Sequence, residues 1–238
     1  MRPAFTNYLA ALLLCLNSLP LLAEPASKIQ ASYDVIGLGM TLANISETFT
    51  RTQDSYRIES VTRAVGFLAS IKPETIRVTS QGMITPQGLI PLSYSLTREL
   101  DTRKNTSAKF NWETAVLTHS SHRGLNDSPL AQGTQDRLSV LYHLPLLAKS
   151  DQTEFKFSIS DGNKLEAYSF HLAPNERDVT VPLGTYKTRY ITSSPIAEEV
   201  KYEIWMAIER DNFPCKIIVT DSKGGKLTQV LTQLTVTP

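Results

Sequence analysis

The sequence predicts an all-β fold, in which an antiparallel meander forms a barrel or a strongly curved half-barrel around one main α-helix. Most of the chain consists of short runs in which apolar and polar residues alternate, as they do in half-buried strands. Turn residues recur between these runs, for example in TPQG at 85–88 and DGN at 161–163. Only GTQDRLSVLYHLPLL, at 133–147, spaces its apolar residues as a helix does.

The first 23 residues have the layout of a secretory signal peptide. One positive charge, on Arg2, precedes an apolar stretch that is too short to span a bilayer, and Ala23 offers a small residue before the cut. We therefore expect an exported protein whose residues 24–238 form a single β-barrel-like domain. No later apolar run approaches the length of a membrane-spanning helix, so we expect no integral membrane segment in the mature chain.

The charge balance of the chain excludes a polyanion as the expected partner. The sequence has 24 Lys and Arg and 23 Asp and Glu, and Arg2 is the only charged residue before position 24. A balanced chain has no overall field that attracts nucleic acid, so no nucleic-acid partner is expected. Cys215 is the only cysteine after the signal segment, so the fold must be stable without an intrachain disulfide.

The strand pattern extends over nearly the whole mature chain. Roughly twelve strands in one sheet need curling or closure to protect their edges, which is why we expect a barrel or half-barrel. Residues 123–132 are the most loop-like stretch and lead directly into the helix. The strand-like segments, in order, are 32–50, 55–66, 74–100, 107–121, 153–173, 178–194 and 200–236.

The helix is predicted over residues 134–144 and is expected to be buried, with a narrow wetted stripe. Thr134 can cap its first turn, and Asp136 there suits the positive end of the helix dipole. Pro145 limits the helix or kinks it. Thr134, Asp136 and Arg137 are therefore expected to anchor the helix by hydrogen bonds rather than to perform chemistry.

The polar stripe of this helix contains Asp136, Ser139 and His143, but its spacing does not suit a catalytic triad. Asp136 and His143 are seven residues apart, which is about 10 Å of rise along one helix. One imidazole cannot contact both the serine and an aspartate at that distance, as a triad requires. No catalytic residue is therefore predicted.

The other polar residues form no recognisable metal or cofactor motif. His119 and His122 are three apart in THSSH, whereas zinc requires three or four ligands, and residues three apart on a strand face opposite sides. We expect no metal site and no cofactor. Several strands carry apolar residues on both faces, which fits either a sheet packed on the helix or a groove for an apolar ligand. For the second case the predicted ligand wall is Tyr33, Phe67, Tyr94 and Trp112.

Several motifs resemble the domain of unknown function 3108 (DUF3108) family, namely GMITPQGLIPLSY, GTQDRLSVLYHL, SDGNKLEAYSF and IWMAIERDNFPCKI, in that order. The resemblance implies an exported bacterial protein with a β-rich, curved or barrel-like sheet, and it supplies no catalytic residue. Asn212-Phe213 stands where many members have a glycine, which suggests a modified turn. The hairpin from Trp205 to Pro214 also resembles that of Lol-type lipoprotein carriers, which hold acyl chains in an open barrel.

These observations lead to three hypotheses about function. The first is a non-catalytic periplasmic binding or carrier protein whose partner is a lipid-like small molecule or an envelope protein. The second is an envelope hydrolase that acts on cell-wall or polysaccharide material, which converging carboxylates in a cleft would support. The third is a structural assembly factor without a pocket, which a dense closed interior would support.

Overall fold

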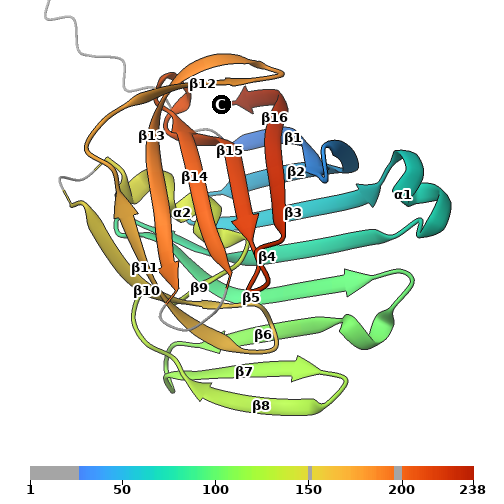
Figure 1. Ribbon diagram of the computed structural model, residues 1–238. Coiled ribbons are helices and arrows are strands. Elements are labelled where there is room, and N and C mark those ends of the chain that lie inside the picture. The colour runs from blue at the N-terminus through green and yellow to red at the C-terminus, as the bar shows by residue number, and fades with distance from the viewer. Residues whose placement is uncertain (1–26, 150–151, 196–199) are drawn as a thin grey trace, which may run out of the picture.

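Sixteen strands pair into one rolled sheet in the computed structural model, which describes residues 27–149, 152–195 and 200–238 (Figure 1). The predicted signal peptide, residues 1–23, lies outside the described residues. The sheet is antiparallel except where β9 runs parallel to β10, and its path does not close. This arrangement confirms the prediction of an all-β meander with a strongly curved, barrel-like sheet.

The first half of the chain is a simple meander, in which each strand pairs with the next. Two short helices interrupt it: α1 (Gly66–Ile71) between β3 and β4, and the 3-10 helix η1 (Thr102–Lys104) between β5 and β6. The strands are β1 (Lys28–Gly37), β2 (Met40–Thr52), β3 (Ser55–Ala64), β4 (Thr75–Thr85), β5 (Gly88–Arg98), β6 (Thr106–Asn111), β7 (Val116–Ser121) and β8 (Gly124–Pro129).

The strands of the second half of the chain extend the sheet on the side of β1 that faces away from β2. The last strand pairs with the first, so the order across the sheet is β8 to β1, then β16 to β13, then β11, β10 and β9, with β12 paired to β13. Its elements are β9 (Gln135–Asp136), α2 (Ser139–Leu147), β10 (Glu154–Ser160), β11 (Leu165–Leu172), β12 (Arg177–Val181), β13 (Gly184–Pro195), β14 (Lys201–Ala207), η2 (Ile208–Arg210), β15 (Phe213–Thr220) and β16 (Lys226–Thr237).

The two edges of the sheet overlap instead of joining in a ladder. Side-chain hydrogen bonds hold the β9–β10 edge against strands β5 to β7. The Gln135 amide donates to the Leu89 carbonyl at 2.9 Å, the Thr106 hydroxyl donates to the Asp161 carbonyl at 2.9 Å, and His119 lies 3.1 Å from the Ser160 hydroxyl. The sheet is therefore a roll in which strand β8, at the outer edge, lies beyond the strands that make these contacts.

The main helix begins and ends later than the sequence predicts. It covers Ser139–Leu147 rather than 134–144, because Gln135 and Asp136 pair with β10 as a short strand. Pro145 lies inside it, and the last turn is closed by the Ala148 N–H, which bonds to the Leu144 carbonyl. The segment 123–132, expected to be a loop, also contains a strand, β8, which has no alternation of buried and exposed residues.

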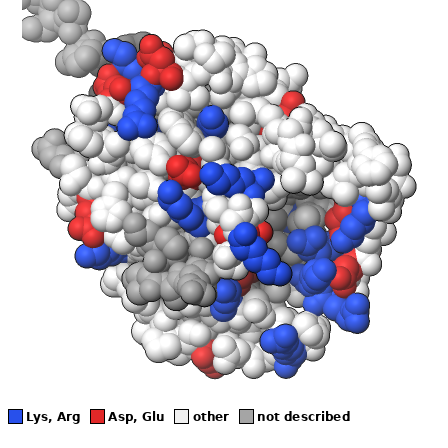
Figure 2. Space-filling model, viewed as in Figure 1, with Lys and Arg blue, Asp and Glu red and all other residues white. Residues whose placement is uncertain are grey.

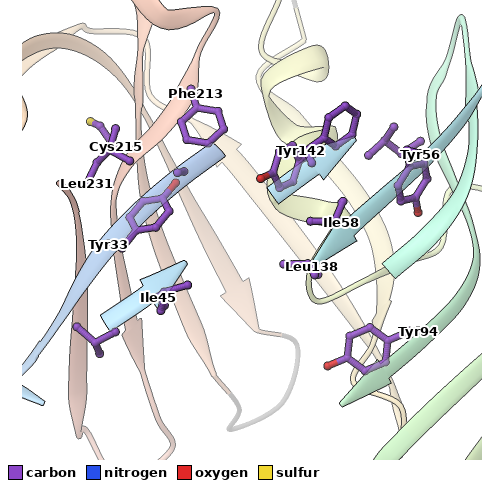
Figure 3. Close-up of a cluster of buried hydrophobic side chains, with 14 of the residues drawn as sticks. Tyr33, Ile45, Tyr56, Ile58, Tyr94, Leu138, Tyr142, Phe213, Cys215 and Leu231 are labelled. Atoms are coloured by element: carbon purple, nitrogen blue, oxygen red, sulfur yellow. The ribbon is translucent and has the colours of Figure 1, made fainter. Parts of the chain in front are cut away.

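Helix α2 lies in the interior of the roll, and most of its residues are buried. Leu138 and Tyr142 pack in a cluster with residues of β1 to β7, β15 and β16, whereas Val140 and Leu144 pack in a second cluster with residues of β10, β11 and β13 to β15. Figure 3 shows part of the first cluster, in which side chains from the first strands, from β15 and from the helix meet. The free thiol of Cys215 is buried there, and burial raises its pKa to about 11.

Candidate functional site

The N-terminal end of α2 is fixed by a buried carboxylate. Asp136 is fully buried, and its Oδ1 accepts hydrogen bonds from the backbone N–H groups of Leu138, at 2.9 Å, and Ser139, at 2.8 Å. Its Oδ2 accepts one from the Ser80 hydroxyl at 2.6 Å. Burial raises the pKa of this carboxyl to about 6, although all three hydrogen bonds oppose the shift. Asp136 therefore satisfies the free N–H groups that begin the helix.

Thr134 and Arg137, the other two predicted anchors, bind elsewhere. The Thr134 hydroxyl donates to the Ala131 carbonyl at 2.7 Å, so it does not cap the helix, which begins five residues later. The Arg137 backbone N–H bonds to the Ser160 carbonyl at 3.1 Å, and its guanidinium lies 3.3 Å from the Asp161 carboxylate. Arg137 thus ties the start of the helix segment to the turn between β10 and β11.

Side chains also replace a missing partner strand along β5. Strand β6 pairs with β5 only from Ser93 to Leu96, which leaves the backbone of the earlier residues without a neighbour on that side. The Leu89 N–H donates to Nδ1 of His143 at 3.2 Å, and the Leu89 carbonyl accepts from Gln135. The Pro91 carbonyl accepts from the Trp112 indole at 2.7 Å. These polar residues therefore satisfy backbone groups that would otherwise be buried without partners.

The predicted wetted stripe of the helix is in fact dry. Asp136, Ser139 and His143 are all buried. The Ser139 hydroxyl accepts a hydrogen bond from the Asp136 backbone N–H at 3.0 Å, whereas His143 accepts one from Leu89. Burial lowers the pKa of His143 to about 4, so its ring is neutral at pH 7. This geometry serves the backbone and has no nucleophile–base hydrogen bond of the kind a triad needs.

The histidines considered for a metal site are separated by the strand geometry. His119 is buried beside Ser160, whereas His122 lies in the turn after β7. Among the residues that the structure describes, no group of three or more His, Cys, Asp or Glu side chains could hold a metal ion.

The four residues of the predicted ligand wall lie at different places in the molecule. Tyr33 is buried and donates to the Pro214 carbonyl at 2.9 Å, and Tyr94 is also buried. Trp112 lines an outer groove between β5 and β6, whereas Phe67 lies on α1 with 72% of its surface exposed. The buried tyrosines belong to the packed core and do not border an open cavity with the other two.

A recess of about 490 Å³ opens beside the C-terminal end of α2. It is bordered by the start of β1, the ends of β2, β4 and β16, the start of β5, and the turn from η2 to β15. Its volume lies in the range of small-ligand sites, and its lining is mainly apolar, as such sites require. The principal apolar lining residues are Phe49, Ile84, Tyr142, Leu146, Phe213 and Leu234.

The aromatic rings of Tyr142 and Phe213 form the inner wall of this recess. Tyr142 stacks on Phe49, with ring centres 5.1 Å apart, and meets the edge of Phe213 at 5.9 Å. Its hydroxyl donates to the buried Glu47 carboxylate at 2.8 Å. Burial raises the pKa of Glu47, and the hydrogen bond from Tyr142 opposes that shift. Tyr142 and Phe213 also line a second, much smaller hollow of about 10 Å³, so both residues lie between it and the recess.

Charged residues surround the opening of the recess. Lys149 pairs with Asp211 at 3.5 Å, and Arg210 lies over the ring of Tyr186. Arg51 also lines a neighbouring depression of about 800 Å³, so it stands between the two hollows. Its Nε donates to the Gln53 carbonyl at 3.0 Å, and no carboxylate of the described residues lies within ion-pair distance of it. Among the described residues, the rim therefore presents two cations without a carboxylate partner, Arg51 and Arg210, beside the carboxylates of Glu209 and Asp211.

The family of the chain follows from the comparison with known sequences. Residues 28–232 match the family described as "Protein of unknown function (DUF3108)". The chain belongs to the DUF3108 family. The turn that the family resemblance marked as modified, between η2 and β15, has Asp211 and Asn212 in the left-handed backbone region, at φ 54° and 60°. Glycine adopts that conformation most easily, so two non-glycine residues there make the turn unusual, as the resemblance suggested.

The rolled sheet of this DUF3108 protein is shared with a solved structure. A β-barrel-like protein from Brucella abortus, of the domain of unknown function DUF1849, superposes with a TM-score of 0.59 and 11% sequence identity. The match covers 89% of this chain and 98% of the other, which shows a common fold. No curated protein sequence matches the chain. Among the described residues, no helix has the length and apolar character needed to cross a membrane.

Proposed function

We propose that this DUF3108 protein is a non-catalytic binding protein that holds an apolar, lipid-like ligand in the recess beside α2. The observation that carries the proposal is the apolar lining of the recess, with Tyr142 and Phe213 as its inner wall. Tyr142 is held by Glu47, and the helix is held by Asp136 at its other end. A wall fixed in this way is formed before the ligand arrives, which lowers the cost of binding.

The charge at the rim narrows the kind of ligand. An amphiphile would place its chain against Phe49, Leu146 and Leu234, and its polar head at the opening. Within the described part of the chain, Arg51 and Arg210 are the rim cations without a carboxylate partner, so an acidic head group would be favoured over a neutral one. The N-terminal segment supports a site of action in the periplasm, since its residues have the layout of an export signal.

The first test is a native mass spectrum of the protein as purified from producing cells without detergent, before and after organic extraction. A reproducible added mass that extraction removes is expected for the wild type. The variant Leu146→Asp places a charge on the recess wall, so it should lose that mass. Leu125→Asp is the matched control, because Leu125 is an exposed leucine on β8, outside the recess.

A second measurement is needed if the wild-type protein is purified without a bound ligand. The stripped protein is titrated with dodecanoate and dodecanol, and binding is followed by the intrinsic fluorescence of its aromatic residues. Uptake by the wild type and by Leu125→Asp, with none by Leu146→Asp, supports the proposal. A wild type that is bare and takes up neither compound would overturn it, as would equal uptake by all three proteins.

A further inference from the structure

Three connections of the sheet meet at the end of the roll that lies opposite the recess. In a meander, every second connection lies at the same end of the strands. The turn at 38–39 between β1 and β2, the α1 segment between β3 and β4, and the η1 segment between β5 and β6 therefore share one end (Figure 1). The Val65 N–H bonds to the Leu42 carbonyl and the Leu100 N–H to the Glu74 carboxylate, so these connections contact their neighbours.

This end exposes large apolar side chains, which we call the apolar tip. Leu38 is 95% exposed, Phe67 72% and Ile71 65%, and Met40 and Leu100 are exposed as well. Helix α1 has no buried residue at all, although its sequence, GFLASI, is apolar. Single exposed apolar residues are common on proteins, but a group of five on neighbouring connections marks a surface that something covers.

The backbone conformation of Leu38 is unfavourable for a leucine, in addition to the exposure of its side chain. Leu38 and Gly39 form a two-residue hairpin turn with φ values of 53° and 78°. Such turns favour Asn or Gly at the first position, because other side chains are strained in the left-handed region. A leucine there is unfavourable both for the turn and for its contact with water. A residue that is strained and exposed together points to a role outside the stability of the fold.

A basic collar lies behind the apolar tip. The segments 37–42, 63–77 and 98–104 hold six Lys and Arg against three Asp and Glu. One of the three carboxylates, that of Glu74, is buried between Lys72 at 3.9 Å and Arg98 at 3.8 Å. Arg103 and Lys104 are both largely exposed, and they share one carboxylate, that of Asp101, at 3.6 Å and 3.1 Å. Figure 2 shows a group of Lys and Arg, with Asp and Glu among them, on the side of the molecule where α1 lies in Figure 1.

We propose that the apolar tip and its basic collar dock on the surface of a bilayer that contains anionic phospholipid. Apolar residues on loop tips enter the boundary between head groups and acyl chains, and Lys and Arg beside them meet the anionic head groups. An excess of positive charge next to the apolar group favours such a surface over a neutral one. The tip shares no residue with the recess, so this inference does not depend on the proposed ligand.

The test is co-sedimentation of the full chain with vesicles of phosphatidylcholine alone and of phosphatidylcholine mixed with phosphatidylglycerol. Leu38→Asn and the double variant Phe67→Ser with Ile71→Ser remove parts of the tip. Met83→Ser is the control, since Met83 is exposed near the opposite end of the strands. Every protein carries the same N-terminal segment, so differences between them report the tip alone.

We expect the wild type to bind the mixed vesicles more strongly, and the double variant to bind them at least about tenfold more weakly. Leu38→Asn should weaken binding while raising the thermal midpoint of unfolding, because Asn suits the turn. These opposite signs separate docking from a structural role. Arg103→Glu with Lys104→Glu should weaken binding to the mixed vesicles only, whereas Lys156→Glu, a charge reversal on β10, should not.

Two results would overturn the proposal. In the first, wild type and tip variants bind both kinds of vesicle equally. In the second, the wild type is a dimer by light scattering and the tip variants are monomers with unchanged vesicle binding, which would make the tip an interface between two copies of this chain.

Discussion

The two ends of helix α2 differ sharply, although the helix is only nine residues long. At its start, Asp136 and Ser139 are fully buried, and the Asp136 carboxylate accepts hydrogen bonds from Ser80, Leu138 and Ser139. At its end, Pro145 and Leu146 face an open recess, and Lys149 lies in solvent. Polar residues are therefore buried at the first end of the helix, whereas apolar residues are exposed at the second.

This contrast suggests that the two ends of α2 have different roles. The polar end fixes the position of the helix, since a buried carboxylate that lost its partners would be costly. The apolar end can then keep a surface that contributes less to stability and is available for binding. Substitutions at the first end should therefore affect folding, and those at the second should affect ligand uptake.

The largest expected effect is that of Asp136→Ala. It removes the acceptor for Ser80 and for two helix N–H groups, and should lower the free energy of unfolding by about 3 kcal/mol. Asp136→Asn keeps an oxygen acceptor, so it should stay within about 1 kcal/mol of the wild type. Urea unfolding at pH 7 measures both. If Asn cost as much as Ala, the carboxylate would act through its charge and not through these bonds.

The next largest effect is the dependence of the unfolding free energy on pH, which has opposite signs for Asp136 and His143. The pKa of Asp136 is raised from 3.8 to about 6, so its stabilising contribution is complete below pH 3.8 and is lost as the pH rises through 6. The pKa of His143 is lowered from 6.5 to about 4, so its contribution is complete above pH 6.5 and is lost as the pH falls through 4.

Two variants separate these contributions between pH 7 and pH 4. Relative to Asp136→Asn, the wild type should gain about 2 kcal/mol of unfolding free energy as the pH falls. Relative to His143→Gln, it should lose a similar amount. Denaturant unfolding at a series of pH values measures both differences. Two differences of the same sign would show that one of the two sites is not buried as described.

The smallest effect lies at the open end. Arg51→Gln should weaken the binding of dodecanoate about fivefold and leave that of dodecanol unchanged, since an exposed charge contributes about 1 kcal/mol. Lys149→Gln is the control, because Lys149 already pairs with Asp211. Both variants should change the free energy of unfolding by less than about 0.5 kcal/mol. An equal loss with both ligands would place Arg51 in the structure of the wall rather than at the head group.

Local sequence patterns predicted the fold well, because strand alternation and turn residues can be recognised within a few consecutive residues. They missed β8, which is exposed on both faces, and β9, whose two residues form a strand only because Ile159 and Ser160 lie beside them. The helix start was placed too early for the same reason. Gln135 and Asp136 fit a helical pattern, but their pairing with β10 outweighs it.

The candidate site was much less predictable. Aromatic character alone selected Tyr33 and Tyr94, which the core uses for packing, and Phe67, which belongs to the apolar tip. The recess draws its residues from both halves of the chain, and no short window contains more than a few of them. Arg51 carries no signal in the sequence, because its lack of an ion-pair partner among the described residues depends on how the chain folds.

The pairing of β1 with β16 determines when the chain can complete its fold. Ser27 bonds to Pro238, 211 positions away, and the whole length of β1 lies against the last strand. Folds dominated by such distant contacts form slowly. Until residues 226–237 have been synthesised, β1 and β15 each present an unpaired edge, and such edges are sites of aggregation. An incomplete chain of this protein would therefore depend on other molecules to shield it.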